Sequence, residues 1–330
     1  MHDWEVSEND NAETTKRIPV LLIFALPTRI ILTILCRSRA SAMSDPLRVV
    51  WYTDPHNIWC WGCEPTIRRL EIVYGRGVEL EIRQGGLFED FRPVREHWAR
   101  MSGGRWSESV LAFFDAVANQ HRMPMDSAGM VDSSDDFNST WPACIAAKAA
   151  ALQGNGADGR YLRALREAWC LDGRAIHRVD VQTEVAREVG LDVNRFTASL
   201  EDESALDAFR RDREEAERLE IQGFPTFLIE RGNASARLNG WQPWEVFEDV
   251  LRQVDPTLEG ATIERSKEGV LSLLERPSRW ATREIAAVLG VTDDDAELLL
   301  EELEGTGRLR SRPVGNGLVW ERVPLLSATP

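Results

Sequence analysis

The most constraining feature of this chain is a pair of cysteines, Cys60 and Cys63, placed between a strand pattern and a helix pattern. Residues 47–53 are rich in β-branched and aromatic side chains, which predicts a buried strand. Pro65 then begins a helical stretch, and alternating side chains over 78–83 predict a second strand. Strand, helix and strand in this order form a βαβ unit with a right-handed crossover. The fold must therefore place the two thiols where the first strand meets the helix.

The following residues complete an α/β fold around a large helical insertion. From about 88 to 219, apolar residues recur at spacings of three and four, which is typical of helices. Strand patterns return at 226–230 and 236–240, and a closing helix is expected over 243–254. We therefore predict a βαβ half and a ββα half, separated by an all-helical insertion.

A second, smaller unit is expected after residues 255–260, which have the composition of a linker. Residues 262–323 show three short helices and two strands, the pattern of a small winged helix-turn-helix domain. The helix that would read DNA opens with Asp293, Asp294 and Asp295, and carboxylates repel phosphates. We therefore expect a module for protein interaction or self-association, and the residues argue against nucleic acid as its partner.

Composition excludes several classes of protein. The 330 residues suggest about two domains, and 43% hydrophobic with 28% charged residues is ordinary for a globular protein. Asp plus Glu exceed Lys plus Arg by 54 to 39, a net charge of −15, which argues against nucleic acid or an anionic membrane surface as the main partner. Five cysteines in so long a chain do not form a disulfide scaffold.

Residues 1–42 differ from the rest of the chain, and three interpretations stay open. The polar, acidic start is followed by the basic pair Lys16-Arg17, an apolar run over 18–36 and the small residues Ala40-Ser41-Ala42. The last three features are typical of a signal peptide, although Arg29 interrupts the run. The same run could anchor the chain in a membrane. Alternatively, Met43 is the true start, and the protein is then cytoplasmic; a signal peptide would mean export.

The position of the cysteine pair favours thiol chemistry. Amide N–H groups at a helix N-terminus stabilise a thiolate, so we expect a lowered pKa and a nucleophilic Cys60. Cys63 lies one turn further on and can resolve a mixed disulfide. Pro225 immediately precedes the strand pattern at 226–230, where a proline at a strand start suits a cis peptide facing the thiols.

Several short motifs occur in order along the chain: Tyr52-Thr53-Asp54-Pro55, Trp59-Cys60-Trp61-Gly62, Glu64-Pro65, Arg68-Arg69-Leu70, Pro142-Ala143-Cys144, Gly190-Leu191-Asp192 and Gly223-Phe224-Pro225-Thr226. In their order and spacing they resemble the thioredoxin-fold DsbA family, especially its FrnE-like branch with a large helical insertion. The resemblance covers about residues 47–254 and implies a thioredoxin domain at 45–255 that exchanges thiols and disulfides with protein or small-molecule substrates. It implies no metal.

The chain departs from this family at the first cysteine. Family members place the nucleophile three residues before the second cysteine of the pattern, and that position falls at Asn57, with Cys60 as the second. Cys63 is then an extra thiol. Either Cys60 and Cys63 form a displaced redox pair, or Cys60 has lost its usual partner.

Three functions follow from these alternatives. The first is a thiol–disulfide oxidoreductase in which Cys60 attacks and Cys63 resolves. The second is a non-catalytic thioredoxin-fold adaptor that lost its nucleophile at Asn57. The third is a glutathione-dependent isomerase or transferase, with glutathione as co-substrate; otherwise we expect no cofactor.

The expected site gathers the two cysteines and a substrate-binding groove. The groove residues are Asn57, which could hydrogen-bond a sulfur, and Trp59, Trp61, Phe224, Pro225 and Thr226. Cys144 and Cys170 lie in helix patterns and are expected in the core. His56 is expected to be a solvated loop residue. No second pair of ligands accompanies the cysteines, so we expect no zinc.

Overall fold

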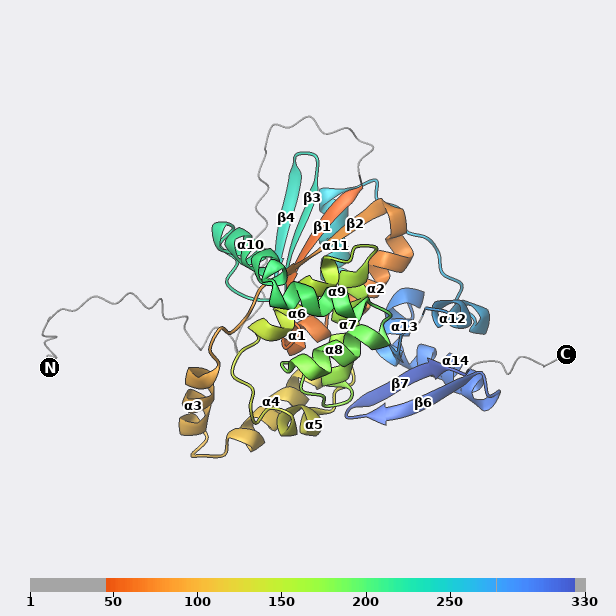
Figure 1. The fold of residues 1–330 in the computed structure, drawn as a ribbon. Helices are drawn as coiled ribbons and strands as arrows, with labels where there is room; N and C mark the ends of the chain where they lie inside the picture. The colour runs from red at the N-terminus through yellow and green to blue at the C-terminus, as the bar shows by residue number, and fades with distance from the viewer. Residues whose placement is uncertain (1–45, 277, 324–330) are drawn as a thin grey trace, which may run out of the picture.

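The computed structural model describes residues 46–276 and 278–323, and its central element is a four-stranded sheet (Figure 1). The strands are β1 (Leu47–Thr53), β2 (Val78–Gln84), β3 (Thr226–Arg231) and β4 (Ala234–Asn239), in the order β2-β1-β3-β4. β1 and β2 are parallel, and the other pairs are antiparallel. The predicted thioredoxin-like α/β sheet is therefore confirmed. The extension predicted at 1–42 lies outside the described residues.

The two faces of the sheet differ because side chains alternate along each strand. One face is apolar: Trp51 stacks on Phe227 at 5.8 Å between ring centroids and packs in the core with α11 (Trp244–Val254). The other face carries a smaller apolar cluster of Val50 and Tyr52 with Ala216, and it also carries charge, with Arg48 bonded to Glu230 at 2.7 Å. The face with Trp51 holds the helices that follow the cysteine pair, so it positions the site.

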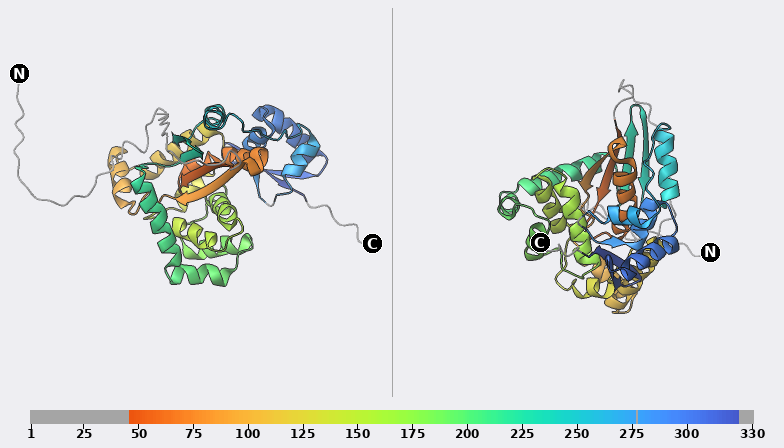
Figure 2. Two further views of the ribbon diagram at one scale, coloured as in Figure 1. Left: turned by 90° about the horizontal axis from the view of Figure 1, so that it is seen from above. Right: turned by 90° about the vertical axis from the view of Figure 1, so that its right-hand side faces the viewer.

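The predicted helical insertion is present as eight helices within the described residues. They are α3 (Arg92–Met101), α4 (Trp106–His121), α5 (Ser127–Asp132), α6 (Trp141–Ala151), α7 (Ala157–Cys170), α8 (Val179–Glu188), α9 (Val193–Glu201) and α10 (Ser204–Arg218). In Figure 1, α3, α4 and α5 lie below the sheet, whereas α6 and α10 also contact β2 along the sheet itself; Figure 2 shows the same helices from two further sides. None of the helices in the described part of the chain has both the length and the apolar character needed to cross a bilayer.

The C-terminal unit is defined here as residues 266–322 and has its own small core around Trp280, Leu300 and Trp320. It contains α12 (Lys267–Leu273), β5 (Trp280–Ala281), α13 (Thr282–Leu289), α14 (Asp293–Gly305), β6 (Leu309–Val314) and β7 (Gly317–Arg322). Its strands are ordered β5-β7-β6, one strand more than the sequence predicted, because Trp280 pairs with Trp320. Its assignment as a winged helix stays a prediction.

The segment expected to be a linker is packed against the thioredoxin part. Asp255 is 3% exposed and forms an ion pair with Arg231, and Leu258 is also buried. The Ala261 N–H donates to the carbonyl of Val73 at 2.7 Å. The C-terminal unit is therefore joined by an anchored connection, which limits its freedom to move away.

Candidate functional site

The cysteines lie in a short, broken helical segment, which we call the site turn (residues 57–64). Asn57 caps α1 (Ile58–Trp61), and its Oδ1 accepts the N–H of Trp59 at 2.9 Å. The sequence predicted the helix from about Pro65 onward, but α1 begins at Ile58 and a separate helix, α2 (Glu64–Arg69), follows. Gly62 stands at the break, where a Cβ would lie 2.6 Å from the His121 ring. Close packing of the insertion therefore requires glycine there.

The loop opposite the site turn (Gly223–Thr226) contains the expected cis peptide, between Phe224 and Pro225. The Asn57 side-chain amide donates to the Phe224 carbonyl at 2.9 Å. Asn57, which is 6% exposed, therefore faces this cis-proline loop directly. The Thr226 hydroxyl donates within the loop to the Gly223 carbonyl at 2.8 Å.

Aromatic side chains border this contact. Trp59, Phe224 and Trp241 are half-buried. The Trp241 indole donates to the Gly62 carbonyl at 2.8 Å, and its ring centroid lies 6.4 Å from that of Trp59. These rings supply the rigid apolar surface that suits recognition of a peptide segment.

Both thiols of the pair are buried, Cys60 at 0% and Cys63 at 2% exposure. Burial raises the pKa of Cys60 to about 11, although the nearby Arg166 guanidinium opposes this. Burial, together with Cys60, raises the pKa of Cys63 well above its ordinary value. The expected lowering of the thiol pKa is therefore wrong. The helix N-terminus belongs to Asn57, and the Cys60 sulfur points into the core instead.

A buried polar cluster lies beneath the site turn. Asp54 accepts the N–H groups of His56 at 2.8 Å and Leu87 at 2.7 Å. The Cys144 thiol lies 3.4 Å from the same carboxylate, so this core cysteine also touches the site. Burial raises the pKa of Asp54 despite these donors. Only its place in the family pattern with Pro142-Ala143 marked Cys144 in the sequence.

The predictions for two other residues, Trp61 and His56, are wrong. Trp61 does not line the groove: it is 1% exposed, and its indole donates to the Pro124 carbonyl at 3.0 Å. His56 is not solvated, because its ring packs between Phe137 and Trp169 with centroids 4.8 and 5.0 Å away. Burial lowers the pKa of His56 to about 3, so the imidazole is neutral.

Sequence reasoning missed a buried group of charged residues behind the site turn. Glu64 directly follows Cys63, and its carboxylate accepts bonds from Arg163 at 3.1 Å and Arg166 at 2.7 Å. The Arg166 guanidinium lies 4.5 Å from the Trp51 ring centroid. The two arginines are three residues apart in α7, a spacing that places them on one helix face and was the available signal. Among the described residues, no three His, Cys, Asp or Glu side chains group as metal ligands.

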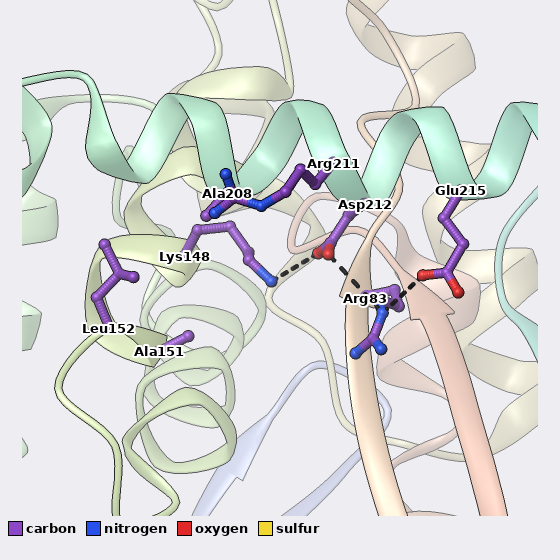
Figure 3. A pocket seen from close by; sticks show the side chains of 8 residues that line it. All are labelled: Arg83, Lys148, Ala151, Leu152, Ala208, Arg211, Asp212 and Glu215. Carbon is purple, nitrogen blue, oxygen red and sulfur yellow. Dashed lines mark hydrogen bonds and ion pairs between the residues drawn. The ribbon is translucent and has the colours of Figure 1, made fainter.

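A separate hollow of about 430 Å³ lies between α6, α10 and β2 (Figure 3). Lys148 pairs with Asp212 at 2.8 Å and Arg83 with Glu215 at 2.9 Å along its wall. Its lining includes neither the site turn nor the cis-proline loop. It is therefore distinct from the candidate site.

Comparison with known proteins agrees with this geometry. Residues 51–249 match the family model described as Thioredoxin. The chain is 28% identical to the ClpXP adapter protein SpxH of Shouchella clausii, over 86% of this chain and 91% of that protein. It is 27% identical to the protein of the same name from Halalkalibacterium halodurans, over 83% and 88%.

A solved structure from Streptomyces coelicolor, described as a probable DsbA oxidoreductase, superposes with a TM-score of 0.51 at 21% identity. The superposition covers 64% of this chain and 91% of that one. That likeness concerns the fold. The match of the family model over more than half of this chain shows that the chain belongs to the thioredoxin family.

Proposed function

We propose that this protein is a thioredoxin-fold adaptor that binds a client protein at the site turn and the cis-proline loop. The observation that carries the proposal is Asn57, whose amide bonds to the Phe224 carbonyl at the helix N-cap. The family resemblance assigns this position to a nucleophilic cysteine. An amide there can hydrogen-bond a peptide but cannot form a mixed disulfide.

The state of the two thiols supports the same proposal. Cys60 and Cys63 are buried, and their pKa values are raised, so little thiolate is present at neutral pH. The half-buried rings of Trp59, Phe224 and Trp241 instead offer a surface for an apolar peptide segment.

The names of the relatives support a protein partner. Two relatives that this chain matches over most of their length are named as adapters of the protease ClpXP. We extend that role to this chain as part of the proposal: the bound client is delivered to ClpXP for degradation. The thioredoxin fold then serves as a binding scaffold.

The test begins with proteins that co-purify with the full chain from its source cells. Each purified candidate is then incubated with reconstituted ClpXP, with and without the chain. We expect at least one client whose degradation requires the chain. The double variant Cys60→Ser/Cys63→Ser retains this effect, and Trp59→Ala, which truncates a ring of the groove, weakens it. Loss of client degradation with the double variant, together with unchanged degradation with Trp59→Ala, would overturn the proposal.

A second candidate, the thiol–disulfide oxidoreductase, is favoured by one observation: Arg166 and Thr53 act against burial to lower the pKa of Cys60. The Cys60 thiolate would attack a substrate disulfide, releasing one substrate thiol and forming a mixed disulfide. Cys63 would then attack Cys60, releasing the second thiol and leaving the pair oxidised. Turnover of insulin with dithiothreitol, lost in Cys60→Ser, would favour this function. Adding glutathione tests the predicted co-substrate in the same assay.

A further inference from the structure

The C-terminal unit reaches the back of the site turn through a wholly buried carboxylate. Glu284, near the start of α13, is 0% exposed. It accepts two bonds from Arg163, at 2.7 and 2.9 Å, and one from Arg68 at 3.2 Å. The N–H of Ala281 donates to the same carboxylate at 2.9 Å. One glutamate of the C-terminal unit therefore satisfies two arginines of the thioredoxin domain.

Arg163 continues this connection to the site turn. The guanidinium that binds Glu284 also binds Glu64, the last residue of the site turn, at 3.1 Å. It lies 4.7 Å from the ring centroid of Trp61, which precedes Gly62. Arg163 thus contacts the site turn on both sides of Gly62-Cys63, while its charge is balanced from the C-terminal unit.

The β6–β7 hairpin makes a second, independent contact. Gly315 has a φ of +50°, and a Cβ there would lie 1.8 Å from the Met125 carbonyl. The Asn316 amide donates to the Ala118 carbonyl at 3.0 Å. The hairpin tip therefore packs against the segment 123–125, whose Pro124 carbonyl accepts the Trp61 indole.

From these contacts we infer that the C-terminal unit holds the site turn in place, with Glu284 as the positioning residue and the hairpin tip as a second support. The inference rests on the proposed function and deepens it, because a site turn fixed from behind presents the half-buried Trp59, next to the Asn57–Phe224 contact, to a client in one shape. It also gives the C-terminal unit a role that needs neither nucleic acid nor a movable tether.

The four buried thiols in the described residues provide the readout. Cys60 and Cys63 lie in the site turn, whereas Cys144 lies in α6 of the insertion. Glu284→Gln keeps the shape of the side chain but removes its charge, which leaves Arg163 and Arg68 without full compensation. Removing one partner of a buried ion pair is strongly destabilising, so local opening of the site turn should become roughly 100-fold more frequent.

The experiment measures iodoacetamide labelling of each cysteine in the native full chain by mass spectrometry. We expect Glu284→Gln to raise labelling of Cys60 and Cys63 by roughly 100-fold, and Cys144 by far less. Gly315→Ala, which displaces the hairpin tip, should produce the same selectivity by another route. The matched control Glu302→Gln removes an exposed carboxylate of α14 and should change nothing.

Two outcomes would overturn the inference. If all thiols become reactive together in both variants, the contacts stabilise the whole protein instead of the site turn. If Cys60 and Cys63 stay protected in either variant, the corresponding contact does not position the turn. Neither readout uses a client, so loss of the proposed adaptor function would show separately, as absence of client binding in the wild-type chain.

Discussion

The two sides of the site turn are held by different kinds of contact. Toward the cis-proline loop, the polar contact is one neutral hydrogen bond from Asn57, bordered by half-buried rings. Toward the C-terminal unit, Glu64, Arg163 and Glu284 are charged and almost completely buried. A neutral hydrogen bond contributes about 1 kcal/mol, whereas a broken buried ion pair costs several. The contact with the cis-proline loop, which we call the front of the site turn, can therefore exchange partners easily. The ion pairs toward the C-terminal unit, which we call the back, cannot.

The largest predicted effect comes from breaking the back of the site turn. Arg163→Met keeps a long apolar stem but leaves Glu64, Glu167 and Glu284 without a shared cation. We expect the free energy of unfolding to fall by about 3–5 kcal/mol, measured by urea denaturation followed through tryptophan fluorescence.

The matched control for this variant is Arg210→Met. Arg210 is 55% exposed at its side chain and pairs with Asp207 on the surface of α10. Exposed pairs contribute little, so we expect a change below about 1 kcal/mol. Equal losses in the two variants would show that the buried ion pairs of Arg163 contribute no more than an exposed pair does.

The sequence predicted the strand and the loop around the front of the site turn better than the charged residues at its back. Strand β1 was predicted with its observed bounds, because a buried strand has a strong local pattern. The sequence also predicted the cis peptide at Pro225, but it expected this proline to face the thiols and did not predict the bond between Asn57 and the Phe224 carbonyl. The charged group behind the turn was not predicted, since Glu64, Arg163 and Glu284 are far apart in sequence and each is typical of an exposed helix surface.

The prediction of the thiol environment was wrong for a related reason. Sequence spacing locates a cysteine along a helix, but the direction of its side chain depends on where that helix begins. Here α1 begins at Ile58, after the Asn57 cap, so Cys60 turns inward. Because the cysteine pair is shifted by one helical turn from the family pattern, the pKa of Cys60 is raised and not lowered.

The next prediction restores the missing nucleophile at the front. Asn57→Cys recreates a two-residue spacing with Cys60 and places a thiol at the N-cap of α1, where amide N–H groups lower its pKa. We expect insulin reduction to rise at least about tenfold over the wild-type chain. Asn57→Ser, which keeps a capping oxygen but no thiol, serves as control. Equal activity in the three proteins would mean that the front no longer supports disulfide chemistry.

The smallest predicted effect concerns the pH dependence of stability. Burial raises the pKa of Cys60 to about 11 and also raises that of Cys63, above the value of about 8.5 for a free thiol. The folded state therefore holds these protons more tightly than the unfolded state does. This contribution to stability is fully present below about pH 8.5 and is lost as the pH rises toward 11.

Comparing the wild-type chain with Cys60→Ser/Cys63→Ser isolates the contribution of the two thiols to the pH dependence of stability. The urea midpoint of the wild-type chain should fall more steeply between pH 8.5 and pH 10 than that of the double variant. Absorbance at 240 nm should show no thiolate from the pair at pH 8 in the folded state. A thiolate signal at neutral pH would contradict the inward position of Cys60 and would return the redox pair to the front of the site turn, where a substrate disulfide can reach it.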